Sequence, residues 1–187
     1  MKLPIYLYGT SVLREVATDV PADYPDLQKL ISNMFDTMYA AEGCGLAAPQ
    51  IGRSIRLVVI DADVLGDTFP ECAGRKFALI NPTVEVLDGE SVARNEGCLS
   101  LPGLSESVSR VEHIRLTWTD ENWQEHTEEM SGFLARIVQH ECDHLYGKVY
   151  MDHVSSTRRM LLRSKLRNLA EGRVACDYPV RSANKHR

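Results

Sequence analysis

The stretch FLARIVQHECDHLYG (133–147) carries both a helical apolar pattern and a candidate metal-binding motif. Its apolar residues recur at the spacing of one helical face, and a glycine follows the pattern as a stop signal. We therefore expect a helix over 133–145 that is buried in the core of the protein. His140, Glu141 and His144 give this helix the pattern HExxH.

The HExxH pattern is compatible with a metal site, because side chains four residues apart stack about 6 Å from each other on a helix. His140 and His144 can therefore offer two imidazole nitrogens to one ion. Glu141 is offset towards the same site, so its carboxylate can act as a base on a water that the ion polarises. The alternative is an ordinary amphipathic helix with two histidines whose hydrogen bonds are satisfied. The motif alone leaves both interpretations open.

An apolar strip leads along this helix to the motif. Phe133 and Ile137 share a helical face with His140 and Glu141. The strip is either core packing or the wall of a pocket for an apolar side chain beside the reacting bond. Cys142 points roughly 200° away from His140 by helix geometry, so we interpret it as a packing residue.

A catalytic metal site needs three protein ligands and one open position, and the helix supplies only two. Three downstream candidates have no defensible spacing: Asp152, His153 and Glu171. Upstream, EGCLSLPG (96–103) places Cys98 in a Gly/Ser/Pro setting that is typical of an accessible turn. A lone cysteine is more often a buried hydrophobic residue. The HExxH motif, which lacks a third ligand, favours a metal-binding role for Cys98 instead.

Length and composition indicate one globular domain. The chain has 187 residues, of which 44% are hydrophobic and 25% are charged. It contains no run of about eighteen apolar residues and no pattern of a signal or transit peptide, so we expect a cytosolic protein without a membrane span. The odd number of scattered cysteines argues against a disulfide framework. The sequence leaves the roles of Cys72 and Cys176 open.

The charge is distributed unevenly along the chain. From Ser155 to the end there are nine Lys and Arg against two Asp and Glu, which gives this segment a formal charge of about +7. The preceding residues carry about −12, so that the net charge of the chain is −5. An acidic body argues against bulk nucleic-acid binding, including binding to DNA. The basic tail leaves open a local contact with a polyanion.

The remaining pattern predicts a compact α+β domain with antiparallel sheet. Besides the helix at 133–145, we expect helices at 26–41 and about 156–171, strands at 54–63 and 77–89, an exposed loop at 63–76, and a hairpin at 107–132. We expect a frayed tail over residues 173–187.

Three segments of the chain resemble the signature segments of peptide deformylases: GCGLAAPQIG (43–52), EGCLS (96–100) and QHECDHL (139–145), in this order. The resemblance covers most of the chain and fades after about Arg173. It implies a catalytic domain over residues 1–172, a compact α+β fold with the HExxH helix buried against antiparallel sheets, and a C-terminal helix. It also implies an enzyme that hydrolyses the formyl group from the initiator methionine of nascent chains and releases formate.

The resemblance also implies roles for individual residues. The metal ligands would be Cys98, His140 and His144, with Glu141 as the general acid–base. The Gln50 side chain and the Leu99 backbone N–H would stabilise the charge on the formyl oxygen. The expected substrate-binding residues are Cys44, Gly45, Gly97, Phe133 and Ile137. The family usually carries an aliphatic residue where Cys44 stands. By itself, the segment 43–52 could be only a tight turn.

The cofactor implied by the resemblance is one divalent ion. A thiolate with two imidazoles suits both Fe²⁺ and Zn²⁺, and the family works best with Fe²⁺ while often being isolated with Zn²⁺ or Ni²⁺. The implied partners are formyl-Met nascent peptides, and no membrane is expected as a partner. The basic helix at 156–171 would contact ribosomal RNA, or would only dock its leucines on the body.

Two other functions remain open at this level. A zinc peptidase would use Glu or His as its third ligand, and a structural zinc module would need four ligands. The sequence offers no convincing fourth ligand.

Overall fold

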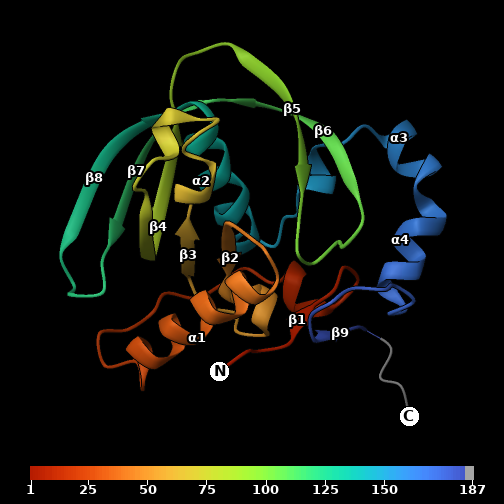
Figure 1. Cartoon of the computed structure of the whole chain (residues 1–187), viewed down its shortest axis with the longest axis horizontal. Helices are drawn as coiled ribbons and strands as arrows, with labels where there is room; N and C mark the ends of the chain where they lie inside the picture. The colour runs from red at the N-terminus through yellow and green to blue at the C-terminus, as the bar shows by residue number, and fades with distance from the viewer. Residues whose placement is uncertain (184–187) are drawn as a thin grey trace.

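The computed structural model describes residues 1–183 as an α+β domain built around one central helix (Figure 1). The largest sheet is antiparallel and has the strand order β2-β3-β4-β7-β8. Its strands are β2 (Gly45–Ala47), β3 (Leu57–Asp61), β4 (Lys76–Val86), β7 (His113–Thr119) and β8 (Glu125–Ser131). A separate antiparallel hairpin pairs β5 (Ser91–Gly97) with β6 (Ser105–Val111). The expected fold class is confirmed.

The central helix is α2 (Gly132–Leu145), which matches the helix expected over 133–145. Its apolar side packs on the large sheet through Leu134, Val138 and Cys142, as expected for Cys142. The other side of the helix carries buried polar side chains, among them the motif histidines. A buried helix of this kind holds its polar groups in fixed positions, which favours a functional site.

The other expected elements are present with shifted boundaries. Helix α1 (Leu27–Ala40) buries its apolar stripe against the large sheet. Strand β4 continues through Pro82 with a register shift between Ile80 and Thr83. The loop at 63–76 contains only short 3-10 turns between strands. The hairpin expected over 107–132 is instead the β7–β8 pair, because β6 pairs with β5.

The C-terminal region differs from the expectation in two ways. The single helix expected at about 156–171 is divided at Leu162 into α3 (Ser156–Leu161) and α4 (Arg163–Ala170). The segment after α4 is not frayed over its described residues, because β9 (Val180–Arg181) pairs in parallel with β1 (Ile5–Tyr6). Residues 184–187 of the expected frayed tail lie outside the described residues. None of the helices within residues 1–183 is long and apolar enough to cross a membrane.

Candidate metal centre and substrate cavity

Three side chains from two elements form a candidate metal centre. Cys98 directly follows β5, while His140 and His144 lie one turn apart on α2. One donor atom from each residue lies within 4.8 Å of the others, and Cys98 Sγ is 3.4 Å from His144 Nε2. It is the only such cluster within residues 1–183. The structure thus brings together the three residues expected as ligands.

The chemistry of this donor set fits a divalent metal ion. Burial, together with the neighbouring His140, lowers the pKa of His144 to about 3, so this imidazole is neutral and able to coordinate. Burial alone would lower the pKa of His140, but contacts with Cys98 and Glu96 outweigh burial and raise it. Binding of a cation would therefore displace a proton from His140. Three ligands beside an open cavity are typical of a catalytic site rather than a closed structural one.

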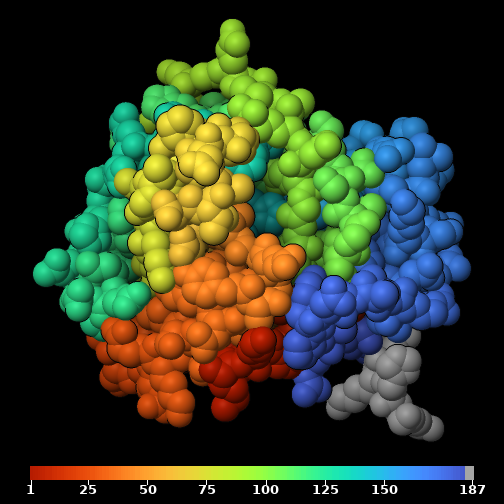
Figure 2. Space-filling model, in the orientation of Figure 1, coloured from red at the N-terminus to blue at the C-terminus, as the bar shows by residue number. Residues whose placement is uncertain are grey.

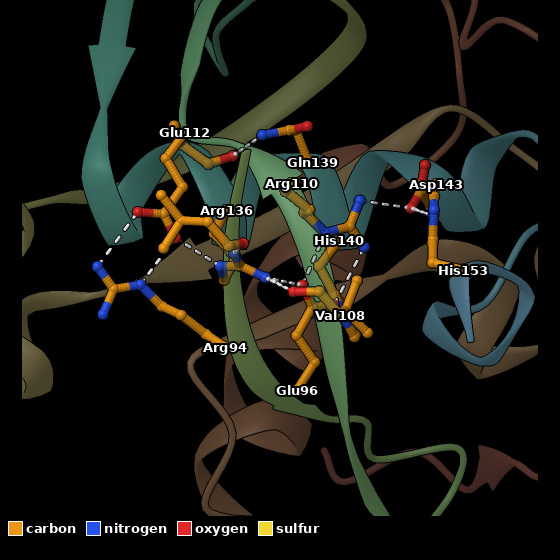
Figure 3. A network of polar contacts seen from close by, with 12 residues as sticks. Arg94, Glu96, Val108, Arg110, Glu112, Arg136, Gln139, His140, Asp143 and His153 are labelled. Carbon is orange, nitrogen blue, oxygen red and sulfur yellow. Dashed lines mark hydrogen bonds and ion pairs between the residues drawn. The ribbon is translucent and has the colours of Figure 1, made fainter. Parts of the chain in front are cut away.

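Glu96 orients His140 from behind (Figure 3). Its Oε2 lies 2.9 Å from His140 Nδ1, which leaves the Nε2 atom of the ring to face the cluster. Arg110 donates two hydrogen bonds to Glu96, of 2.7 and 3.0 Å, and Arg136 donates a third of 2.7 Å. Burial alone would raise the pKa of Glu96, but the bonds with His140 and Arg110 hold it far below its ordinary value. Glu96 is therefore a fixed anion.

Glu141 is a buried carboxylate with an unsatisfied oxygen. The side chain is 6% exposed, and its Oε2 has no hydrogen-bond partner within the described residues. Burial, reinforced by the negative charge of Glu96, raises the pKa of Glu141 to about 7 although His140 opposes the shift. A carboxyl group with this pKa can both accept and donate a proton near neutral pH.

Gly45 allows the close approach of Glu141. A Cβ atom at position 45 would lie 2.5 Å from Glu141 Oε1, so any larger residue would push the carboxylate aside. The same absence of a side chain lets the backbone at Gly45 lie close to the site.

Gln50 presents an amide donor to the site. It lies on a short 3-10 helix (Ala48–Ile51) and is 1% exposed. Its Oε1 accepts a 2.8 Å hydrogen bond from the Ala47 N–H, so its Nε2 faces Cys98 Sγ at 3.3 Å and Ser100 Oγ at 3.2 Å. The amide can therefore donate a hydrogen bond without adding a titrating charge.

A cavity of about 690 Å³ opens beside these groups. In Figure 2 it corresponds to the hollow between the orange, yellow and green segments, with the teal atoms of α2 at its bottom. Six residues expected at the site line it together with Cys98 and His140: Cys44, Gly45, Gln50, Gly97, Leu99 and Glu141. Burial raises the pKa of the Cys44 thiol to about 12, so this side chain is an uncharged part of the wall.

Two expected substrate-binding residues do not line this cavity. Phe133 stacks on Phe69, with ring centroids 4.2 Å apart and planes at 7°. Ile137 is 5% exposed and belongs to the apolar core. Phe133 and Ile137 share a helical face with the motif, but Phe69 and the core cover the end of this face that they occupy.

Several residues at the site were not among those predicted from the sequence. Glu96 lies in the segment EGCLS, and its position two residues before the candidate ligand Cys98 is the signal that could have indicated it. The residues from Ala175 to Tyr178 also line the cavity, and no local pattern indicated this. Cys176 is thus part of the cavity wall, whereas Cys72 is a core residue. All five cysteines are free, as expected.

Comparisons with known proteins agree with the fold and the motifs. The family model for Polypeptide deformylase matches residues 2–160. A peptide deformylase of Christiangramia forsetii is 44% identical over an alignment of 191 residues, covering 98% of this chain and 97% of that protein. A peptide deformylase of Salinibacter ruber is 41% identical and covers 96% of this chain and 94% of its own. The crystal structure of peptide deformylase from Thermus thermophilus superposes with a TM-score of 0.80 at 38% identity, covering 90% of this chain and 98% of that chain.

Proposed function

The chain belongs to the polypeptide deformylase family, and on that premise we propose the role of each site residue in the reaction. The protein is a metal-dependent hydrolase that removes the N-formyl group from the initiator methionine of nascent polypeptides and releases formate. The single observation that carries the division of roles is the position of the buried Glu141 beside the cluster of Cys98, His140 and His144.

We propose that Cys98, His140 and His144 hold one divalent ion. Their donor atoms already lie within 4.8 Å of one another, and Glu96 holds the ring of His140 in place. When bound there, the ion supplies Lewis acidity, which polarises the formyl oxygen and lowers the pKa of a water molecule.

Glu141 carries the proton in this proposal. Its carboxylate takes a proton from the attacking water and later returns it to the nitrogen of the departing amine. A pKa raised to about 7 supports both transfers, because the carboxylate is then a stronger base than an ordinary one and the carboxyl group is still acidic enough to give the proton back. Its unsatisfied Oε2 is free to accept the hydrogen bond from water.

Gln50 and Leu99 stabilise the negative charge that develops on the formyl oxygen. Both residues line the cavity, and the Gln50 Nε2 atom already points towards Cys98. A side-chain amide and a backbone N–H act here as fixed donors, so they need little reorganisation when the charge appears.

The methionine side chain of the substrate occupies the same cavity. We assign direct contact to Cys44, Gly45 and Gly97, which line it. Phe133 and Ile137 support the cavity wall from the core side, because Ile137 belongs to the apolar cluster against which Phe133 and Cys44 pack. Phe69 covers the ring of Phe133.

We infer that the ion in the cell is Fe²⁺, with Zn²⁺ or Ni²⁺ as the ion retained on isolation. One thiolate and two imidazoles bind all three ions, and the thiolate cancels one positive charge of the ion. Cys98 is only half-buried, so oxidants can reach both the iron and its sulfur ligand.

The place of action follows from the substrate. Nascent chains are made by ribosomes in the cytosol, and we propose that the protein acts there. Helices α3 and α4 support a ribosome contact, because Met160 is 74% exposed and Leu161 is 72% exposed beside the basic residues. The exposed basic side chains on these helices are Arg158, Arg159, Arg163, Lys165 and Arg167. Arg158 is already paired with Glu106, at 2.8 and 2.9 Å, and contributes less free charge.

Sedimentation with purified ribosomes tests this contact. The double variant Arg159→Glu, Arg163→Glu should dissociate from the ribosomes at a lower salt concentration than the wild type does. The matched control is Arg53→Glu together with Lys29→Glu, because both residues are exposed and lie outside these helices. Equal sedimentation of the two double variants, or none for the wild type, would refute the contact.

Formate release tests the proposed function directly. Anaerobically prepared protein should release one formate for each formyl-Met peptide consumed, and it should leave the unformylated twin of the peptide intact. Cleavage of peptide bonds in the twin would instead indicate a general metallopeptidase.

A further inference from the structure

Residues 174–183, which we call the C-terminal strap, join the same two apolar clusters as the loop that carries the metal ligand. Val174 and Cys98 pack against one cluster, which is formed mainly by residues 101–169. Tyr178 and Leu99 pack against another, which includes α1. The strap and the loop therefore both run from one apolar cluster to the other.

The N-terminal segment fixes both the strap and the loop. Ile5 N–H donates to Pro179 O and Leu7 N–H donates to Arg181 O, each at 2.8 Å. The next N–H along the chain, that of Tyr8, donates to Ser100 O at 2.8 Å. One short stretch of backbone therefore sets the position of the strap relative to the loop.

A direct hydrogen bond joins the two segments. The Tyr178 hydroxyl donates to Leu99 O at 2.8 Å. Burial raises the pKa of Tyr178, so the hydroxyl keeps its proton and remains a donor throughout the neutral range. The bond to the carbonyl of Leu99 holds the planar peptide group between Leu99 and Ser100. The preceding peptide group carries the Leu99 N–H and is joined to this plane through the Leu99 Cα, so it has less freedom to turn.

The strap also forms part of the cavity wall. Ala175, Cys176, Asp177 and Tyr178 line the cavity together with Gly45 and Glu141. In Figure 2 the blue C-terminal segment lies against the orange and green segments that border the hollow. A peptide that fills this cavity therefore contacts the strap as well as Gly45 and Glu141.

We propose that Tyr178 is a positioning residue for the deformylation reaction and that the strap is the wall that selects the residues following formyl-Met. The first part rests on the proposed role of the Leu99 N–H as a donor to the formyl oxygen. Tyr178 does not touch the reacting atoms; it acts through the peptide groups of Leu99. The strap acts on the substrate directly, by contact.

The conservative variant Tyr178→Phe tests the positioning role in the full chain. It keeps the ring and its packing and removes only the hydrogen bond to Leu99. We expect kcat on formyl-Met-Ala amide to fall about 3- to 10-fold, the size of one lost hydrogen bond, with KM nearly unchanged. The matched control is Tyr24→Phe, because Tyr24 is half-buried against the same apolar cluster. Equal kcat values for the two variants would overturn the positioning role.

The variant Tyr178→Ala tests the wall. It opens the cavity where the strap lines it, so KM should rise more for a formyl-Met tetrapeptide than for formyl-Met-Ala amide. An equal rise for both substrates would overturn selection by the strap. Metal content and the melting temperature, measured on each variant, separate these effects from loss of the folded site.

The wild type separates this inference from the proposed function. If the wild type releases formate but Tyr178→Phe matches Tyr24→Phe, only the positioning role fails. If the wild type releases no formate from either substrate, the function itself fails.

Discussion

Glu96 Oε2 lies 2.9 Å from His140 Nδ1, and this contact joins the face of α2 that carries the motif histidines to a buried set of charges (Figure 3). Arg136 is 1% exposed and donates to both Glu96 and Glu112, so it ties α2 to the β5–β6 hairpin. Cys98 follows strand β5 in the loop of this hairpin, and the helix carries the two histidines. The buried charges therefore hold the two halves of the proposed metal site in a fixed relative position.

We predict that Glu96→Gln weakens metal binding about 10- to 100-fold, because His140 loses its anionic hydrogen-bond partner. The dissociation constant, measured by competition with a chromogenic chelator, checks this. Glu112→Gln is the matched control, since Glu112 is also buried and bonded to Arg136. An equal loss of affinity in both variants would show that the charge network, and not the contact with His140, determines metal affinity.

The pH profile should report Glu141. Burial raises its pKa to about 7, and a base must be deprotonated to accept the proton of water. We therefore expect kcat/KM to increase as the pH rises from 5 and to level off near or below 7, because a bound cation favours the carboxylate form. A kcat/KM that falls as the pH rises from 5 to 7 would contradict this role.

The identity of the ion should control both activity and its decay in air. We expect the anaerobic ferrous protein to be more active than the zinc protein and to lose activity on exposure to air, through oxidation of iron or Cys98. Metal analysis and mass spectrometry of the inactivated protein would distinguish these two lesions. Equal and equally durable activity of the ferrous and zinc preparations would count against Fe²⁺ as the ion in the cell.

The cavity should prefer cationic peptides. The acidic residues that line it are Glu42, Glu141 and Asp177, and no lysine or arginine of the described chain lines it. At low salt we expect formyl-Met-Ala-Lys to have a KM about two- to fivefold lower than formyl-Met-Ala-Glu. Asp177→Asn should narrow this difference and Asp67→Asn, outside the cavity, should not. A preference that persists at high salt would point to shape rather than charge.

Local sequence patterns were sufficient to predict helices α1 and α2 and the turn between β7 and β8. The apolar periodicity of α1 and α2 and the turn between β7 and β8 lie within single short windows of sequence. The cluster of Cys98, His140 and His144 could be anticipated because each of these residues lies in a motif with its own chemistry. The face of α2 that carries Phe133 was also predictable, but not Phe69 as its cover, since that contact joins distant segments.

The remaining features depend on contacts between distant segments. Strands β1 and β9 have two residues each, and their pairing joins the two ends of the described chain. Such short strands have no period that a sequence window could detect. No local pattern in the sequence indicates that Arg136 is buried, and the carboxylates of Glu96 and Glu112, which come from a distant segment, explain its burial.

Formate release by Glu141→Gln tests the central claim most directly, when it is measured together with the metal content of the variant. The amide has nearly the shape of the carboxylate but cannot accept the proton of water. We predict that turnover of a formyl-Met peptide falls about 10²- to 10⁴-fold while the variant retains its full complement of metal. Turnover close to that of the wild type, or loss of the metal together with activity, would contradict the assignment of Glu141 as the proton carrier beside Cys98, His140 and His144.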